Sequence, residues 1–449
     1  MAVTVAGLPF QFCLQDSASG STGFMFKSTA DAYVFDGVAS TITKITDTDY
    51  PAVTVPGVAF LDGYFFVMDA NGVIYNSGLE TPLVWNSLDF INCEAEPDGG
   101  MAITKYLNYV VGFGKWTTQF FYDAANATGS PLAPVQNATI QTGCANGYSV
   151  AQFDGKLVWM GNCQEKGRGV YALSGGTTPA KLSTPDIDRI LNADSLATVY
   201  SWGAGFAGHS LYVLSLVTSG ITLVYDFSTQ AWSQFTRRTA AAAKSVSSLT
   251  QSGGIATAVC TAHGNSDGDQ VTIAGATPSG YNGAKNISYI DANTFAFECT
   301  DTLATPATGT ITATGTTEGY FDLAYYANAG GKDIVQGATD GIVYEMLGTA
   351  YDDNGVTIDA SCRTTIWDGK TTKRKTIGSA EVIGDKVSAN AFLRYSDDDY
   401  VTNSKYRKVD LSVNRSRLTR LGSTSRRSFE LRHTASTAFR VEALEIEGD

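Results

Sequence analysis

The stretch Val150-Ala151-Gln152-Phe153-Asp154-Gly155-Lys156-Leu157-Val158-Trp159 places an Asp-Gly pair between two apolar runs. Asp and Gly both tolerate the positive φ angles of a tight turn, so this pattern is a strong local signal for a β-hairpin. The chain continues with a third strand-like run, Gly169-Val170-Tyr171-Ala172-Leu173, and a weaker fourth one, Ala180-Lys181-Leu182-Ser183. Residues 150–183 therefore predict a unit of about four antiparallel strands.

The same unit recurs along the chain. One aromatic residue marks the third strand of each copy, and these residues are Phe35, Tyr75, Phe121, Tyr171, Tyr225 and Tyr344. Their spacings are 40, 46, 50, 54 and 119 residues. A four-strand repeat with a period near 45 residues is typical of a β-propeller blade. The six copies predict an all-β chain with a six-bladed, β-propeller-like body.

The long last spacing indicates an insertion. Residues 250–316 are rich in Thr, Ala and Gly, contain almost no basic residues, and carry alternating runs such as Thr294-Phe295-Ala296-Phe297-Glu298. Such alternation is typical of half-buried strands, and removing the segment restores a spacing of about 50 residues. We therefore expect blades in residues 1–249, an inserted small β-domain in residues 250–316 and the last blade in residues 317–350.

The pattern changes again after Asp352-Asp353-Asn354-Gly355. The expected strands become longer and more charged, as in residues 375–382 and 439–446. Strands with one charged open face suit a β-sandwich or a sheet platform. Residues 351–449 are therefore expected to form a C-terminal β platform domain.

The composition supports a folded, strand-rich chain. Among 449 residues there are 46 Gly, 22 Tyr and 22 Phe, and the hydrophobic fraction of 43% argues against disorder. The sequence contains no run of about 18 apolar residues and no visible secretory signal, so no membrane span is expected. These features predict a soluble protein made in a cytoplasm.

The charge of the chain is uneven. Its formal total of −13 argues against a protein that reads nucleic-acid sequence, since such proteins normally carry a basic face. Residues 361–449 hold 17 basic and 12 acidic residues, whereas residues 1–360 hold 14 basic and 32 acidic ones. An acidic body with a basic end suggests two surfaces for two partners. A chance fluctuation across a domain boundary is the alternative.

The basic residues of the C-terminal region form the sharpest electrostatic feature. The candidate docking residues are Lys373, Arg374, Lys375, Arg415, Arg417, Arg420, Arg426 and Arg427. They suit an acidic partner, or they form a solvated face balanced by nearby acids. Sequence-specific DNA binding is a third reading that the acidic total disfavours.

Signatures of catalysis are missing from the sequence. It contains no G-x-S-x-G, P-loop or H-E-x-x-H motif, and its three His residues lie far apart. Paired carboxylates could serve glycoside hydrolysis, and the candidates are Asp62, Glu94, Glu96, Asp154 and Asp226. Asp62 and Asp154 precede Gly in expected hairpins, where Asp is chosen for its backbone conformation. We therefore predict no enzyme activity, no catalytic residue and no cofactor.

Metal and thiol chemistry also lack support. The seven cysteines are scattered singly, so we expect buried free thiols, although Cys260 and Cys299 could pair in an oxidising compartment. Residues 397–399 and 265–269 are acidic enough to bind a cation, but neither matches a calcium-binding loop. Solvated loops without a metal are the expected state.

Several runs follow one another in a characteristic order. They are Tyr33-Val34-Phe35-Asp36-Gly37, Trp85-Asn86-Ser87-Leu88-Asp89-Phe90, Gly112-Phe113-Gly114-Lys115-Trp116-Thr117-Thr118-Gln119-Phe120-Phe121-Tyr122, Ile140-Gln141-Thr142-Gly143-Cys144-Ala145 and Val224-Tyr225-Asp226 with Trp232. In this order they resemble the tail nozzle proteins of short-tailed bacteriophages, also called tail hub or packaged-DNA stabilisation proteins. The resemblance covers residues 30–240 well and the last blade and C-terminal region loosely. Residues 250–316 lie outside it.

The resemblance implies a structural virion protein. It implies a homo-hexameric tube below the portal and adaptor ring that closes the DNA exit after packaging and conducts DNA on ejection. Its implied partners are portal and adaptor proteins, tail fibres, spikes or a needle, and genomic double-stranded DNA that passes without sequence recognition. The implied location is the virion tail, after assembly in the host cytoplasm. We hypothesise that the acidic body surrounds the channel and that the basic end docks a neighbour.

A phage adhesin or carbohydrate-binding or carbohydrate-hydrolysing β-propeller is the alternative. Exposed Trp side chains can stack on sugars, and Trp85, Trp116 and Trp232 are the candidates. All three are expected at equivalent strand positions of the repeats, where they would instead form the core of the blades.

Overall fold

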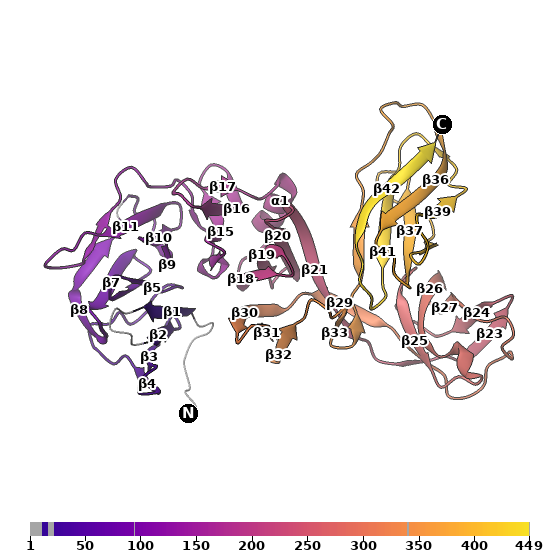
Figure 1. The fold of residues 1–449 in the computed structure, drawn as a ribbon, viewed down its shortest axis with the longest axis horizontal. Helices are drawn as coiled ribbons and strands as arrows, with labels where there is room; N and C mark the ends of the chain where they lie inside the picture. Colours follow the sequence, from indigo (N-terminus) through magenta and orange to yellow (C-terminus); the bar gives the residue numbers. More distant parts are fainter. Residues whose placement is uncertain (1–10, 17–21, 94, 339–340, 449) are drawn as a thin grey trace. The chain divides into compact units, whose positions relative to one another are not determined.

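The computed structural model describes residues 11–16, 22–93, 95–338 and 341–448. The chain divides into two compact units (Figure 1). The first unit comprises Met1–Phe235 and Tyr320–Met346, and the second comprises Thr236–Gly319 and Leu347–Asp449. Strands dominate both units, so the predicted all-β class is confirmed.

Six antiparallel sheets form the described part of the first unit, in agreement with the six repeats. The first three sheets contain β1 (Gln11–Asp16), β2 (Thr22–Lys27), β3 (Ala32–Asp36) and β4 (Thr41–Lys44); β5 (Ala59–Leu61), β6 (Tyr64–Met68), β7 (Val73–Gly78) and β8 (Thr81–Asn92); and β9 (Gly100–Tyr106), β10 (Tyr109–Gly114), β11 (Thr118–Asp123) and β12 (Leu132–Pro134). Each strand pairs with its sequence neighbour, as in a propeller blade.

The remaining sheets vary this plan. The fourth contains β13 (Gly143–Cys144), β14 (Ala151–Phe153), β15 (Lys156–Cys163), β16 (Gly167–Ser174) and β17 (Ala180–Lys181). The fifth contains β18 (Val199–Phe206), β19 (His209–Leu216), β20 (Ile221–Asp226), β21 (Ala231–Ala240) and β29 (Thr316–Tyr320), and the sixth contains β30 (Leu323–Ala329), β31 (Lys332–Gly337) and β32 (Val343–Met346). The boundary between the two units falls within β21 and β29.

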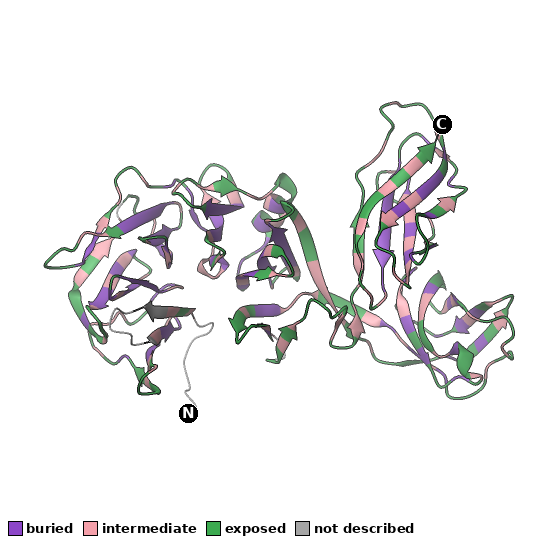
Figure 2. Cartoon of the chain, viewed as in Figure 1, coloured by how far each residue is buried: buried purple, intermediate pink, exposed green. Residues whose placement is uncertain are grey.

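Consecutive sheets of the first unit share hydrophobic cores. Met25 of the first sheet packs with Phe65 and Val67 of the second, and Ile74 of the second packs with Val110 of the third. Similar clusters join the third sheet to the fourth, the fourth to the fifth and the fifth to the sixth. Figure 2 shows the burial concentrated on the middle strands, while fourth strands such as β4, β8 and β21 are largely exposed. The core of the first unit is therefore a series of sheet-to-sheet contacts.

The two Asp-Gly hairpins have the expected geometry. Asp62 and Gly63 have φ angles of 47° and 91°, and Asp154 and Gly155 have φ angles of 48° and 67°. Positive φ at both central residues defines the type I′ turn, whose twist matches that of the strands on either side. The turns connect β5 to β6 and β14 to β15.

One α-helix in the described part of the chain was not expected from the repeat. Helix α1 (Pro185–Ala193) begins after Thr184, whose side chain accepts a hydrogen bond from the amide of Ile187. A Thr N-cap, a Pro at the first position and Asp186 in the first turn are strong helix-start signals. The sequence therefore contained the signal for α1.

The inserted segment is one seven-stranded sheet around a single core. Its strands are β22 (Lys244–Ser245), β23 (Ser248–Ser252), β24 (Ile255–Val259), β25 (Gln270–Ala274), β26 (Gly283–Asp291), β27 (Thr294–Glu298) and β28 (Thr312–Thr314). Leu249, Val271 and Phe295 from three different strands are fully buried in the core.

The C-terminal region is a β-sandwich. After a short hairpin of β33 (Asp352–Asp353) and β34 (Val356–Thr357), one sheet contains β35 (Ala360–Arg363), β41 (Ser428–His433), β37 (Asn390–Ser396) and β38 (Arg407–Asp410). The other contains β39 (Ser416–Thr419), β36 (Lys375–Gly384), β40 (Ser423–Thr424) and β42 (Val441–Gly448). Leu393 and Phe429 of the first sheet pack against Val382 of the second. The division into four parts at residues 249, 316 and 350 stays a prediction.

Candidate functional site

The net charge of the chain lies in one unit. The first unit contains 23 acidic and 10 basic residues, a net of −13. The second unit contains 21 of each and has no net formal charge. All eight candidate docking residues belong to the second unit, where the acidic residues equal the basic ones in number.

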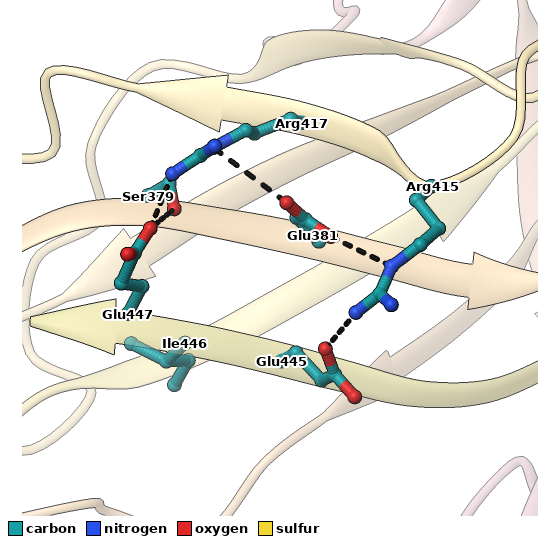
Figure 3. Close-up of a pocket in the computed structure, with 7 residues that line it drawn as sticks. All are labelled: Ser379, Glu381, Arg415, Arg417, Glu445, Ile446 and Glu447. Carbon is teal, nitrogen blue, oxygen red and sulfur yellow. Dashed lines mark hydrogen bonds and ion pairs between the residues drawn. The ribbon is translucent and has the colours of Figure 1, made fainter.

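Arg415 and Arg417 lie in a network of ion pairs on the open face of β39, β36 and β42 (Figure 3). Arg415 lies 2.9 Å from Glu381 and also contacts Glu445. Arg417 lies 3.6 Å from Glu381 and also contacts Glu447. These residues, with Ser379 and Ile446, line an open hollow of about 540 Å³. The two arginines are therefore matched by three carboxylates of their own chain.

Arg427 is a correction to the sequence-based set of docking residues. Its side chain is only 1% exposed and makes two hydrogen bonds to Asp397, of 2.6 and 2.7 Å. It also donates to the carbonyl oxygen of Leu421 and stacks 3.7 Å from the ring of Tyr395. Arg427 therefore holds the sandwich together and is buried away from any partner. Its neighbour Arg426 is exposed and contacts Asp399.

The remaining candidate docking residues differ in whether their side chains already bind groups of their own chain. Lys375 donates to three backbone carbonyl oxygens, those of Thr371, Lys373 and Ser425. Arg374 is exposed and makes one hydrogen bond, of 3.2 Å, to the carbonyl oxygen of Ser423. The side chains of Lys373 and Arg420 are exposed and form no hydrogen bond or ion pair with any described residue. Lys373, Arg374 and Arg420 are thus the candidates best able to meet a partner.

A buried network of charges was not expected from the sequence. Arg432 of β41 lies 2.8 Å from Asp269 of the inserted sheet and bonds through Nε to both carboxylate oxygens of Asp359, at 2.9 and 3.0 Å. Arg238 of β21 lies 2.7 Å from Asp359 and 2.8 Å from Glu318 of β29. The side chains of Arg432, Asp269, Asp359 and Arg238 are each no more than 15% exposed. Side chains alternate along β41, so Arg432 lies on the face away from the core side chains Phe429 and Leu431. Its partners are too distant in sequence for a pattern to predict them.

A second set of charges lies beside this network on the same face of β41. Glu430 accepts hydrogen bonds from Arg363 at 2.8 Å and from Tyr406, and it pairs with Arg394 at 2.7 Å. Burial alone raises the pKa of Glu430, but the hydrogen bonds and the arginine charges outweigh it and lower that pKa. In the same way, burial works to lower the pKa of Arg432, while Asp359 and Asp269 outweigh it and raise that pKa. Glu430 and Arg432 therefore stay charged at neutral pH.

Weaker contacts surround the network and join the inserted sheet to the sandwich. Gln270 donates to the carbonyl oxygen of Thr434 at 3.0 Å, and Asn286 donates to the Thr434 hydroxyl at 2.6 Å. Lys408 of the sandwich pairs with Glu298 of the inserted sheet at 3.0 Å. Basic residues of the C-terminal region thus bind the acidic inserted domain of their own chain. We name this contact, centred on Arg432, Asp269 and Asp359, the internal anchor.

The acidic clusters are occupied by local contacts. Asp397 pairs with Arg427 and Asp399 with Arg426, while Asp398 accepts hydrogen bonds from Thr402 and Ser396. The bonds from Thr402 and Ser396 lower the pKa of Asp398 to about 2. Asp267 and Asp269 accept from backbone amides and from Arg432. No group of three or more metal-binding side chains occurs among the described residues.

The carboxylates considered for glycoside hydrolysis make local contacts in turns and loops. Asp154 contacts Lys156 and Ser210, and Asp226 bonds to His209, Ser228 and Thr229. The pKa of Asp226 is about 2, because these bonds outweigh the effect of burial. Asp62 occupies its hairpin turn, and Glu96 lies in a loop. Glu94 lies outside the described residues.

The thiols and Trp side chains belong to the scaffold. None of the seven cysteines forms a disulfide; Cys144 and Cys260 are buried, as expected, but Cys362 is exposed, and burial raises the pKa of Cys144 to about 12. Trp85 is buried in the core between the first two sheets, and Trp232 donates to the carbonyl oxygen of Leu182. Trp116 is half-buried and lies in the loop between β10 and β11. The expectation that Trp116 occupies a strand position like those of Trp85 and Trp232 was therefore wrong.

The six sheets of the first unit define a class of protein, a β-propeller scaffold, which is joined here to a second, strand-rich unit. A family model described as "Bacteriophage P22 Gp10, beta-propeller" matches residues 16–253, just over half of the chain. The chain belongs to this phage stabilisation family, whose members are structural proteins of the phage tail nozzle. This confirms the resemblance found in the sequence and locates the protein in the virion tail.

Solved structures are similar to the chain only at a coarse level. A chain of the mitotic checkpoint complex is 14% identical, covers 72% of this chain and 85% of its own length, and has a TM-score of 0.34. BamB from Moraxella catarrhalis is 13% identical, with coverages of 75% and 97% and a TM-score of 0.31. Scores this low carry no argument about function. No curated protein matches the chain in sequence. Among the described residues, no helix is both long and apolar enough to cross a membrane.

Proposed function

We propose that six copies of this chain form a tube below the portal and adaptor ring of a short-tailed phage. The tube retains packaged double-stranded DNA and conducts it on ejection without reading its sequence. Membership of the phage stabilisation family supports the location, and the division of charge supports the mechanism. The mechanism needs neither a catalytic residue nor a cofactor.

The acidic first unit suits a channel through which DNA must slide. Double-stranded DNA carries one negative charge for about every 1.7 Å of its axis, so a basic lumen would bind it tightly. Residues 45–104 contain nine acidic residues and no Lys or Arg. Carboxylates repel phosphates at short range, and salt screens the repulsion beyond about 10 Å. The first unit is therefore the part proposed to surround the channel.

The second unit supplies the contact to a neighbouring tail protein in this proposal. Of the eight candidate docking residues, Lys375, Arg415, Arg417, Arg426 and Arg427 already bind groups of their own chain, which leaves Lys373, Arg374 and Arg420. These three exposed cations fit an acidic partner surface. The fibres, spikes or needle are proposed to attach at another part of the tube.

Charge reversal at the three cations tests the docking contact. We expect the triple variant Lys373→Glu, Arg374→Glu, Arg420→Glu to lower the yield of DNA-filled particles at least tenfold, because like charges then face the partner. The matched control reverses Lys115, Lys166 and Lys386, which are also exposed. Particle yield is measured by counting DNA-filled particles in electron micrographs. Equal yields for the two triple variants would contradict the docking contact.

A further inference from the structure

Exposed apolar side chains gather on one edge strand of the first unit. Within twelve residues, Leu79, Leu83, Val84, Leu88 and Phe90 are 56%, 39%, 56%, 75% and 42% exposed. Four of them lie on β8, the outermost strand of the second sheet. We name these five residues the β8 strip. Long apolar edge strands invite association with another chain, and natural proteins usually protect them with Lys or Pro.

Part of the β8 strip packs against its own sheet, since the ring of Phe90 lies 6.2 Å from that of Tyr75 and Leu79 covers the Gly63 turn, whereas Val84 and Leu88 are largely exposed. The inward contacts of β8 come from Trp85, which is 4% exposed and packs in the core between the first two sheets, and from Ile91, which packs against the core between the second and third sheets. Pairing of β8 with β7 is irregular, since Tyr75 pairs with Phe90 but Ser77 pairs with Trp85. The residues between Trp85 and Phe90 form a bulge in which the amide of Leu88 donates to the side chain of Asn86. The bulge presents Leu88 to solvent, as bulges often do at functional edges.

The sequence around the β8 strip carries charges of a single sign. Glu80 and Asp89 lie within it, and residues 45–104 as a whole contain no Lys or Arg. Lys and Pro normally protect edge strands; β8 has Pro82 at its start but no lysine beside the exposed Leu88. A self-complementary contact, in which the strips of two copies face each other, would bring these carboxylates together, which is unfavourable.

We infer that the β8 strip is a docking surface for a different virion protein, one that presents apolar side chains flanked by Lys or Arg. The apolar side chains of the partner would cover Val84, Leu88 and Phe90, and its cations would meet Glu80 and Asp89. This inference goes beyond the proposed tube, because it holds for any number of copies.

Photocrosslinking in assembled particles tests the inference. A benzoylphenylalanine at position 88 keeps the site apolar, and a matched control at Val38, in the same unit and 77% exposed, lies outside the strip. We expect position 88 to crosslink to another virion protein, within a segment of apolar residues next to Lys or Arg, and position 38 not to do so. A crosslink to this same chain or to a second copy, to an acidic segment, or to nothing would overturn the inference.

Two substitutions at one position give an independent test. Leu88→Glu and Leu88→Lys both introduce a charge at an exposed site, so the isolated protein should keep the melting temperature of the wild type. We expect both to lower particle yield, with Leu88→Lys at least fivefold worse, because Lys meets a basic partner. Val38→Glu and Val38→Lys serve as controls and should assemble normally. Equal yields from the Leu88 variants and the wild type, or a worse yield from Leu88→Glu, would overturn the inference.

Discussion

Single residues decide the turns of the first unit. Gly63 and Gly155 both have positive φ angles, which other L-residues adopt only at a cost. A Cβ atom on Gly155 would meet nothing within 4 Å, whereas one on Gly63 would lie 2.6 Å from the side chain of Leu79. The Asp-Gly pattern made both turns predictable from the sequence, but only the structure distinguishes their surroundings.

This difference gives a paired prediction. We expect Gly155→Ala to lower the free energy of unfolding of the first unit by about 1 kcal/mol, from backbone strain alone. Gly63→Ala should cost more, because the added methyl group also displaces Leu79. Urea denaturation followed by tryptophan fluorescence measures both. Equal losses for the two variants would contradict the role assigned to Leu79.

The first sheet contains a buried lysine that the sequence did not predict. Lys27 is fully buried, and its ammonium group donates to the carbonyl oxygen of Val55 at 2.8 Å. Burial lowers the pKa of Lys27 to about 7. A charged side chain within a strand pattern normally indicates an exposed face, so the sequence alone could not place Lys27 inside.

The pKa of Lys27 predicts how stability depends on pH. Since the folded pKa is about 7 and the unfolded value is 10.5, the unfolded chain binds more protons between these values. Stability should therefore rise with pH from about 7 to 10.5, and the full cost of the charged amine is present below pH 7. We expect Lys27→Met to be more stable than the wild type by roughly 2 kcal/mol at pH 6, after loss of the hydrogen bond to Val55. Denaturation of both proteins should show that gap closing by pH 10, and a gap independent of pH would contradict the assignment.

At the scale of elements, repeats were predictable and long-range partners were not. The six sheets follow the aromatic anchors, because each blade is local in sequence and its strands pair with their neighbours. The signal for α1 was present at Thr184 and Pro185 but was hidden by the strand repeat. The internal anchor depends on Arg432 and Asp269, which are 163 residues apart, and only the fold brings them together.

The internal anchor predicts a strong effect from one substitution. Arg432→Met removes the cation 2.8 Å from Asp269 and leaves Asp359 with Arg238 as its remaining arginine partner, and breaking a buried pair typically costs about 3–5 kcal/mol. Lys408→Met removes only the exposed pair with Glu298, and its effect should lie within experimental error. Hydrogen exchange of β25 and β41 measures the difference. Similar exchange rates in the two variants would show that the anchor does not hold the inserted sheet to the sandwich.

At the scale of the whole molecule, the charge division is the main result. The sequence showed an acidic body and a basic end, and the structure assigns the entire net charge of −13 to the first unit. The structure also shows that part of the basic end cannot bind another protein, because residues such as Arg427 and Arg432 are buried within the second unit. Sequence counts could not reveal this, since they do not show which cations already have partners.

Electron cryomicroscopy of the assembled tail tests the central claim most directly. The account predicts six copies of this chain around the DNA axis, with first-unit carboxylates, including those of residues 45–104, lining a channel that contains DNA. A channel lined by basic side chains or by the second unit, or a subunit that lies away from the DNA axis, would contradict it.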